Sequence, residues 1–138
     1  MDSTMKRIHH IPELPYSIEH ERRLMLRSSF PWMLSKLQYK HGWDILVYQM
    51  LGVIQIKVED LGIETRSIHI QHIKEKWGAL SVHGYWPDEV DPIVEAAQAR
   101  SEYVCEECGA DGQMWVGLGE WWYTRCTRHI KADSVPVE

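Results

Sequence analysis

The chain is short of several residue types, and each shortage argues against a class of protein. Its 138 residues include three Cys, one Phe and no Asn. An odd number of cysteines cannot all pair within one chain, so a disulfide-stapled secreted domain is disfavoured. Every apolar run is far shorter than the roughly 20 residues that span a bilayer, and the polar N-terminal segment lacks the apolar core of a signal peptide. We therefore expect a cytoplasmic protein that makes no membrane contact.

Sequence signatures of catalysis are also missing. The chain contains no Ser/His/Asp pattern, no Gly-rich phosphate loop and no nucleotide-binding fingerprint. Some nucleases that bind a metal through histidine carry similar Cys knuckles, but they need a His base, an Asn and a further ligand around the metal. Because the chain has no Asn, that interpretation is weakened. We expect a protein that is not an enzyme and has no small-molecule substrate.

The composition is typical of one globular domain with a small appendage. Hydrophobic residues make up 44% and charged residues 25% of the chain, which is the range of folded proteins. The net charge of −5 is unevenly distributed, with +3 over residues 1–41, −5 over 42–104 and −3 over 105–138. An acidic middle and end argue against a protein that coats nucleic acid. The basic first segment leaves a local nucleic-acid contact open.

Hydrophobic periodicity predicts an α+β fold. The clearest helix lies over 43–61, where apolar residues recur at i, i+3, i+4 and i+7. Alternating residues predict a central β-hairpin, whose loop over 74–78 is longer than the tightest turns. The full prediction is helices over about 17–27, 31–41, 43–61 and 87–101, a hairpin with strands near 67–72 and 80–85, and a smaller hairpin with strands 113–116 and 121–125.

These elements divide the chain into four parts. We predict a flexible arm over residues 1–16 and an α+β body over 17–104, formed by the N-terminal helices, the central hairpin and the last helix. Residues 105–130 are predicted to form a zinc-ribbon-like knuckle hairpin, and 131–138 a frayed tail.

Four residues have the spacing of a zinc site. Cys105 and Cys108 form a C-x2-C step, and Cys126 and His129 form a C-x2-H step after seventeen intervening residues. Zinc prefers thiolate and imidazole ligands in a tetrahedral shell, and a shell filled by four side chains is structural rather than catalytic. A redox Cys pair is the alternative, but such a pair opens a helix after a strand, whereas this one follows a helix. We predict one structural Zn²⁺ ion.

Three groups of residues are candidates for binding a partner. The adjacent Trp121 and Trp122 must point to opposite faces of a strand, so one packs inward and the other is exposed. The Lys74, Lys76 and Trp77 turn offers positive charge beside an aromatic ring, which suits a nucleic-acid base and phosphate or forms an ordinary charged loop. The third candidate is an acidic patch near the zinc site, formed by Glu102, Glu106 and Glu107.

Three histidines in the central hairpin raise the question of a second metal site. His69 and His72 are separated by an odd number of positions, so a regular strand would place them on opposite faces. His83 lies on the following strand. We therefore interpret the three histidines as surface or half-buried residues, and a metal-dependent hydrolase that uses them is the least favoured hypothesis.

The segment from Gly42 to His129 resembles a group of small uncharacterised proteins from tailed phages, prophages and bacterial genomes. Three pieces carry the resemblance: the GW-initiated helix at 42–46, the IKEKWGAL stretch at 73–80, similar to (V/I)KEK(F/W)GxL, and the stretch SEYVCEECG at 101–109 followed by Trp-rich residues and C-x2-H. The resemblance implies a zinc site and an origin in a mobile element, and it implies no particular chemistry.

These observations lead to a first hypothesis and an alternative. The first is a non-enzymatic, zinc-stabilised protein-binding module, phage-encoded, that binds a host protein and inhibits or redirects it, as an anti-defence inhibitor would. The alternative is a nucleic-acid-binding regulator that uses the basic N-terminal helices and the Lys74–Trp77 turn, with affinity that falls steeply with salt.

Overall fold

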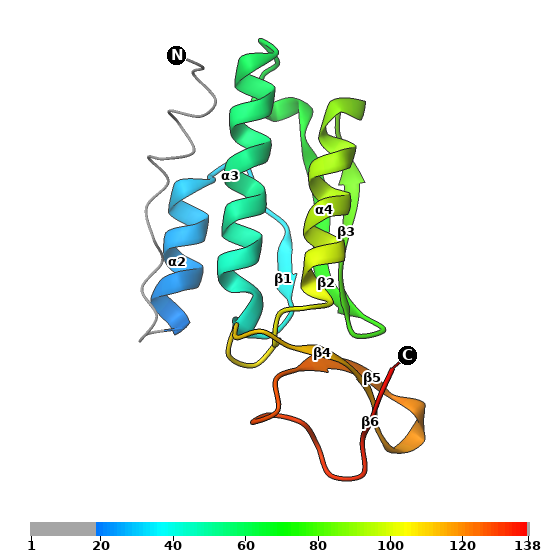
Figure 1. Ribbon diagram of the computed structural model, residues 1–138. Helices are drawn as coiled ribbons and strands as arrows, with labels where there is room; N and C mark the ends of the chain where they lie inside the picture. Colours follow the sequence, from blue (N-terminus) through cyan, green and yellow to red (C-terminus); the bar gives the residue numbers. More distant parts are fainter. Residues whose placement is uncertain (1–18, 138) are drawn as a thin grey trace.

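The computed structural model describes residues 19–137 and has a mixed α+β architecture (Figure 1). The predicted arm over 1–16, and residues 17 and 18 at the start of the first predicted helix, lie outside the described residues. In chain order the elements are α2 (Glu19–Ser29), β1 (Lys36–Gln38), α3 (Asp44–Asp60), β2 (His69–Lys76), β3 (Ala79–Tyr85), α4 (Asp91–Ser101), β4 (Gln113–Val116), β5 (Trp122–Arg125) and β6 (Val135–Pro136).

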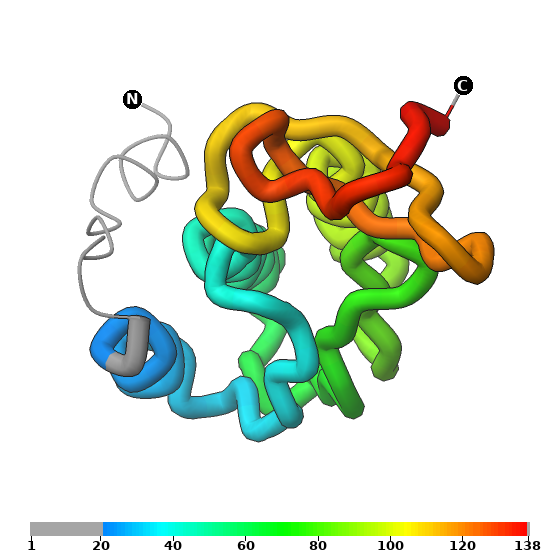
Figure 2. Tube along the Cα trace, turned by 90° about the horizontal axis from the view of Figure 1, so that it is seen from below, coloured from blue at the N-terminus to red at the C-terminus, as the bar shows by residue number. Residues whose placement is uncertain are grey.

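The body has a helical layer on one face of a three-stranded sheet. Helices α3 and α4 lie in front of the sheet, whose strand order is β1-β2-β3, and α2 lies beside α3 (Figure 1). Viewed from below, the helices occupy one side of this sheet (Figure 2). The core lies between the two layers and contains the fully buried Val47, Leu51, Ile54 and Ile73. The opposite face of the sheet is covered by no helix within residues 19–137.

The second sheet belongs to the C-terminal segment. Strands β5, β4 and β6 form it in that order, and it lies at the end of the body where α4 and the β2–β3 turn finish (Figure 1). The predicted tail is wrong in part, because Val135 pairs with Val116 and Pro136 pairs with Trp115 as a third strand. A two-residue strand carries no periodic signal, so only its pairing with β4 reveals it.

Helix α3 confirms the strongest prediction from the sequence. Its apolar face is buried, and Trp43, just before its first residue, is also fully buried. The Asp44 carboxylate is buried as well and is held at 2.7 Å by the Arg23 Nε and at 2.8 Å by the His41 Nδ1. Arg22 lies 3.4 Å from the same carboxylate. Two basic residues of α2 therefore pair with a buried acid of α3, and removal of either partner would leave a buried charge uncompensated.

The predicted helix over 31–41 is wrong. Pro31 and Trp32 form a turn, and Lys36–Gln38 forms strand β1, which pairs in parallel with residues 72–74 of β2. Leu34, an apolar residue of this segment, is 85% exposed. The spacing of apolar residues over this short segment is helical by coincidence, and long-range pairing with β2 determines its conformation.

The central hairpin is confirmed, but its loop is shorter than predicted. Strands β2 and β3 pair up to Lys76 and Ala79, so only Trp77 and Gly78 form the turn. Both have positive φ angles, 54° and 82°, which defines the type I′ turn that suits the twist of a two-residue hairpin. Asn and Gly are the residues usually found at the first of these positions, and a Trp there is uncommon.

The predicted opposite orientation of His69 and His72 is also wrong. A β-bulge between Ile70 and His72 shifts the register, so that His69 pairs with Tyr85 and His72 pairs with His83. An extra residue in one strand changes the alternation of side chains. Both histidines therefore share the face of the sheet that points away from the helices, while Ile70 and Ile73 are buried on the inner face.

Candidate metal centre and tryptophan cleft

The four predicted metal ligands lie together. The ligand atoms of Cys105, Cys108, Cys126 and His129 are all within 4.8 Å of one another. A zinc ion about 2.3 Å from each thiolate places neighbouring sulfurs about 3.8 Å apart, because a tetrahedron's edge is about 1.6 times its centre-to-corner distance. The Cys108 and Cys126 sulfurs are 3.7 Å apart, and the Cys105 sulfur is 3.7 Å from the His129 Nδ1. The cluster is a potential metal site compatible with one structural zinc ion.

Two tight turns and the β4–β5 pairing assemble this cluster. In the first turn the Gly109 N–H donates to the Cys105 carbonyl at 2.8 Å, and the φ of Gly109 is 82°. This left-handed conformation is one that glycine adopts without a side-chain clash. In the second turn the His129 N–H donates to the Cys126 carbonyl at 3.0 Å. Strand pairing between residues 113–116 and 122–125 brings the two turns together.

The cysteines differ in their tendency to ionise. Burial raises the pKa of Cys105. Burial also acts to raise the pKa of Cys126, but hydrogen bonds from His129, the Arg128 backbone and the neighbouring cysteines outweigh it and lower that pKa to about 6. A thiolate is the form that binds a metal, and a bound metal cation would favour the thiolate at each cysteine. Of the two cysteines, Cys126 therefore ionises more readily than Cys105.

The metal knuckle is fastened to the start of α3. The Gly42 N–H donates to the Glu106 carbonyl at 2.8 Å, and the Trp43 indole N–H donates to the Val104 carbonyl at 2.8 Å. A Cβ at Gly42 would overlap the backbone carbonyls of Cys105 and Glu106, so any larger residue would push the knuckle away. The GW pair singled out in the sequence is thus where the body and the knuckle meet.

A second contact fastens the small sheet to the turn of the central hairpin. The Thr124 hydroxyl is buried and donates to the Gly78 carbonyl at 2.6 Å. A Cβ at Gly78 would lie 3.1 Å from the Cα of Tyr123. The Glu75 carboxylate accepts the Gly78 N–H at 2.8 Å and so closes the turn. Within the KEKWG stretch, Glu75 and Gly78 therefore have structural roles, whereas Trp77 has 71% of its surface exposed.

The predicted acidic patch does not form as expected. Glu106 is buried and its carboxylate lies 3.3 Å from Arg125, so it is not part of the surface. Burial raises the pKa of Glu106, and Arg125 opposes this. Glu107 accepts from Lys40 at 2.5 Å, and this hydrogen bond lowers its pKa. Glu102 is exposed. Two of the three acids thus pair with cations inside or beside the knuckle.

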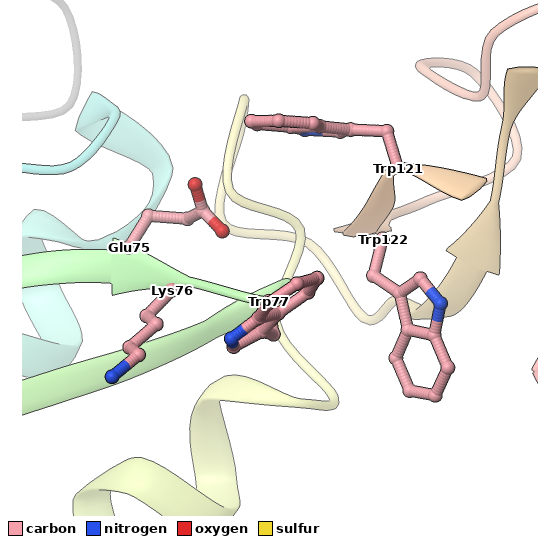
Figure 3. A pocket seen from close by; sticks show the side chains of 5 residues that line it. All are labelled: Glu75, Lys76, Trp77, Trp121 and Trp122. Atoms are coloured by element: carbon pink, nitrogen blue, oxygen red, sulfur yellow. The ribbon is translucent and has the colours of Figure 1, made fainter. Parts of the chain in front are cut away.

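Three tryptophans from two distant segments line one cleft, which we call the tryptophan cleft. Trp77 comes from the β2–β3 turn, Trp122 is the first residue of β5, and Trp121 immediately precedes that strand. Figure 3 shows the Trp77 and Trp121 rings on opposite sides of the hollow, with the Glu75 carboxylate at one edge and Trp122 at the other. Lys76 also lines the hollow, whose volume is about 260 Å³.

The tryptophan cleft is open to solvent. Trp121 is 63% exposed and Trp122 is 37% exposed, so the expectation that one of them packs inward is wrong. Trp121 precedes β5, whose first residue is Trp122, and strand alternation therefore does not apply to the pair. A second hollow, lined by Trp77, Trp122, Val116 and Glu120, shares two of these tryptophans with the cleft. Of the predicted partner-binding residues, Lys76, Trp77, Trp121 and Trp122 come together here, whereas Lys74 lies on the outer face of the sheet.

The histidines of the central hairpin are not gathered into a metal site. His72 and His83 have ring centroids 4.7 Å apart, but His69 is stacked instead against Tyr85 at 6.5 Å. Among residues 19–137, the Cys/His cluster is the one group of three or more potential ligands close enough to share a metal ion. None of the helices in that part of the chain is long and apolar enough to cross a membrane.

No protein-family model, curated protein or solved structure matches this chain. Function is therefore inferred from the metal cluster, the tryptophan cleft and the distribution of charge.

Proposed function

We propose that the protein is a zinc-stabilised binding module whose tryptophan cleft binds another protein. The observation that carries the proposal is the meeting of Trp77, Trp121 and Trp122 around one solvent-open hollow. Tryptophan is the residue most enriched at energetically dominant positions of protein interfaces, where it fills pockets on the partner. One zinc ion bound by the three cysteines and His129 would hold the segment that carries Trp121 and Trp122.

The backbone at Trp77 supports this proposal. A bulky side chain at a positive φ costs about 1 kcal/mol or more, and Trp77 has a φ of 54°. With 71% of the ring's surface exposed, its packing does no more than roughly offset this strain. Folding alone would favour Asn or Gly at this turn position. A role in binding accounts for a large aromatic residue that stability does not require.

The composition of the cleft favours a protein surface as its partner. Its walls are mostly indole, and its charged groups are Glu75 and Lys76, with Glu120 beyond Trp122. An apolar centre with a few charges at the rim is the usual composition of a protein interface. The resemblance to phage and prophage proteins extends the proposal to a host protein, which this module would inhibit or redirect without catalysis.

Capture from a lysate of the cells that express the gene tests the proposal. Wild-type protein and the variant Trp121→Ala are compared with Leu34→Ala, which truncates a side chain that is 85% exposed in the α2–β1 connection. We expect one protein to be retained, after nuclease treatment, by the wild type and Leu34→Ala but not by Trp121→Ala. Equal retention by all three would show that the cleft is not the binding site.

A further inference from the structure

The outer face of the β1-β2-β3 sheet carries charge of one sign. Side chains at paired positions of neighbouring strands share a face of the sheet. On the face opposite the helices, β1 and β2 contribute the pairs Lys36 with His72 and Gln38 with Lys74. Strands β2 and β3 contribute the pairs His69 with Tyr85, His72 with His83, Lys74 with Ser81 and Lys76 with Ala79. The titratable side chains in this set are three lysines, three histidines and one tyrosine. None of the described residues in these paired positions is acidic.

This concentration of cations is unexpected in a chain with a net charge of −5. Like charges at neighbouring positions of a sheet repel each other and destabilise it. The pKa of His72 is lowered first by burial and then by the positive charges of Lys74, His83 and Lys76, which lie at the paired positions around it. Stability of the sheet does not explain the pattern, whereas attraction of a polyanion does.

The same face carries flat rings beside the cations. Tyr85 is 69% exposed, and its ring lies nearly parallel to that of His69, with an interplanar angle of 22°. At the other end of the sheet, Trp77 extends from the turn that follows Lys76. Lys74 and Lys76 are two positions apart on one strand, which separates them by about 6.7 Å and allows each to contact a different phosphate of an extended strand.

We propose that this outer face binds single-stranded nucleic acid, with Lys36, Lys74 and Lys76 contacting phosphates and Tyr85 stacking on a base. Lysines that follow the backbone and aromatic rings that stack on bases are the two elements of sequence-tolerant single-strand binding. An acidic protein would use the lysines alone and would have no need of the Tyr85 ring. The site adjoins the tryptophan cleft at Lys76, whereas Lys36, Lys74 and Tyr85 lie outside the cleft. The two neighbouring surfaces would allow one module to hold a protein and a nucleic acid together.

Two basic residues of α2 are engaged inside the body rather than at this surface. Arg22 and Arg23 bind the buried Asp44, and Arg23 also donates at 2.7 Å to the Tyr39 carbonyl. The nucleic-acid hypothesis thereby moves from the N-terminal helices to the sheet.

The test is a fluorescence-anisotropy titration with a labelled oligothymidylate, a labelled duplex of the same length and a labelled polyglutamate. We expect the oligothymidylate to bind most tightly. Its log affinity should fall with log salt concentration with a slope near −2, because each of three phosphate contacts contributes about −0.7 for a single strand. No binding of the oligothymidylate at low salt, or equal binding of polyglutamate, would overturn the proposal.

Two variants of equal charge separate a local effect from a general one. Lys36→Gln/Lys74→Gln/Lys76→Gln should weaken binding at least tenfold and bring the salt slope close to zero. Lys57→Gln/Arg100→Gln/Arg128→Gln removes three exposed cations from α3, α4 and the knuckle and should leave both quantities unchanged. Equal losses in the two variants would contradict a site on the sheet.

The aromatic part of the proposal has its own variants. Tyr85→Ala should weaken oligothymidylate binding about tenfold, since stacking on one base contributes that much or more. Trp121→Ala, in the tryptophan cleft, should bind the oligonucleotide as the wild type does. Unchanged affinity of Tyr85→Ala would remove stacking from the account and overturn the preference for single strands.

Discussion

The Trp77–Gly78 turn allows the stability of the fold and the proposed binding function to be separated in one variant, Trp77→Asn. Asn-Gly is the favoured pair for a type I′ turn, so the substitution relieves about 1 kcal/mol of backbone strain. With 71% of the Trp77 surface exposed, only about 70 Å² of it is buried. At about 25 cal/mol per Å², that burial contributes at most about 2 kcal/mol, and Asn replaces part of it. The free energy of unfolding should change by less than about 1 kcal/mol.

Binding should change far more than stability. Removing a dominant interface tryptophan costs at least about 2 kcal/mol, which weakens affinity about thirtyfold or more. The assay combines urea unfolding with titration of the captured partner, and Trp43→Ala serves as the comparison, because that ring is fully buried and its loss should cost about 3–5 kcal/mol. If Trp77→Asn destabilised the fold as much as Trp43→Ala, or bound its partner normally, the argument from backbone strain would be refuted.

Three further predictions concern the metal, its attachment and pH. Cys126→Ser should abolish metal binding, and since structural zinc contributes about 10 kcal/mol or more to folding, the NMR signals of β4 and β5 should collapse to those of unfolded chain. Gly42→Ala should lower the free energy of unfolding, measured in urea, by about 3 kcal/mol or more, because the added Cβ meets backbone carbonyls. The control is Gly119→Ala, where the added Cβ meets open space and φ is 75°. This control should lower the free energy of unfolding by only about 1 kcal/mol. The pKa of His72 is lowered in the folded protein, so as pH falls the unfolded chain takes up this proton before the folded chain does. The free energy of unfolding should therefore decrease as pH drops below about 6.5. The His72→Gln variant should lose less stability than the wild type between about pH 7.5 and 5.5, and equal losses would contradict the lowered pKa.

Local patterns in the sequence were sufficient where short-range chemistry determines the structure. The metal ligands are an example, because two C-x2-C/H turns and a hairpin between them leave few other arrangements. Helix α3 is another, since its apolar face extends over the whole of Asp44–Asp60.

Features that depend on distant contacts could not be predicted in the same way. Strand β1 forms because β2 offers it a partner, and three residues are too few to show a period. The β-bulge before His72 places His69 on the same face as His72, contrary to expectation. No residue type in this stretch predicts the bulge. The tryptophan cleft joins the β2–β3 turn to β5 through the contact of Thr124 with Gly78. Trp77, Trp121 and Trp122 were candidates from the sequence, but their common site required the fold.

The central claim is that one zinc ion holds the knuckle that presents Trp121 and Trp122 to the cleft. Native mass spectrometry of the purified full-length protein, before and after treatment with a chelator, tests it most directly. The account predicts one zinc per chain, and predicts that chelation produces a metal-free species with the broad, high charge states of a partly unfolded chain. A protein that carries no metal, or that keeps its compact charge states when the metal is removed, would contradict it.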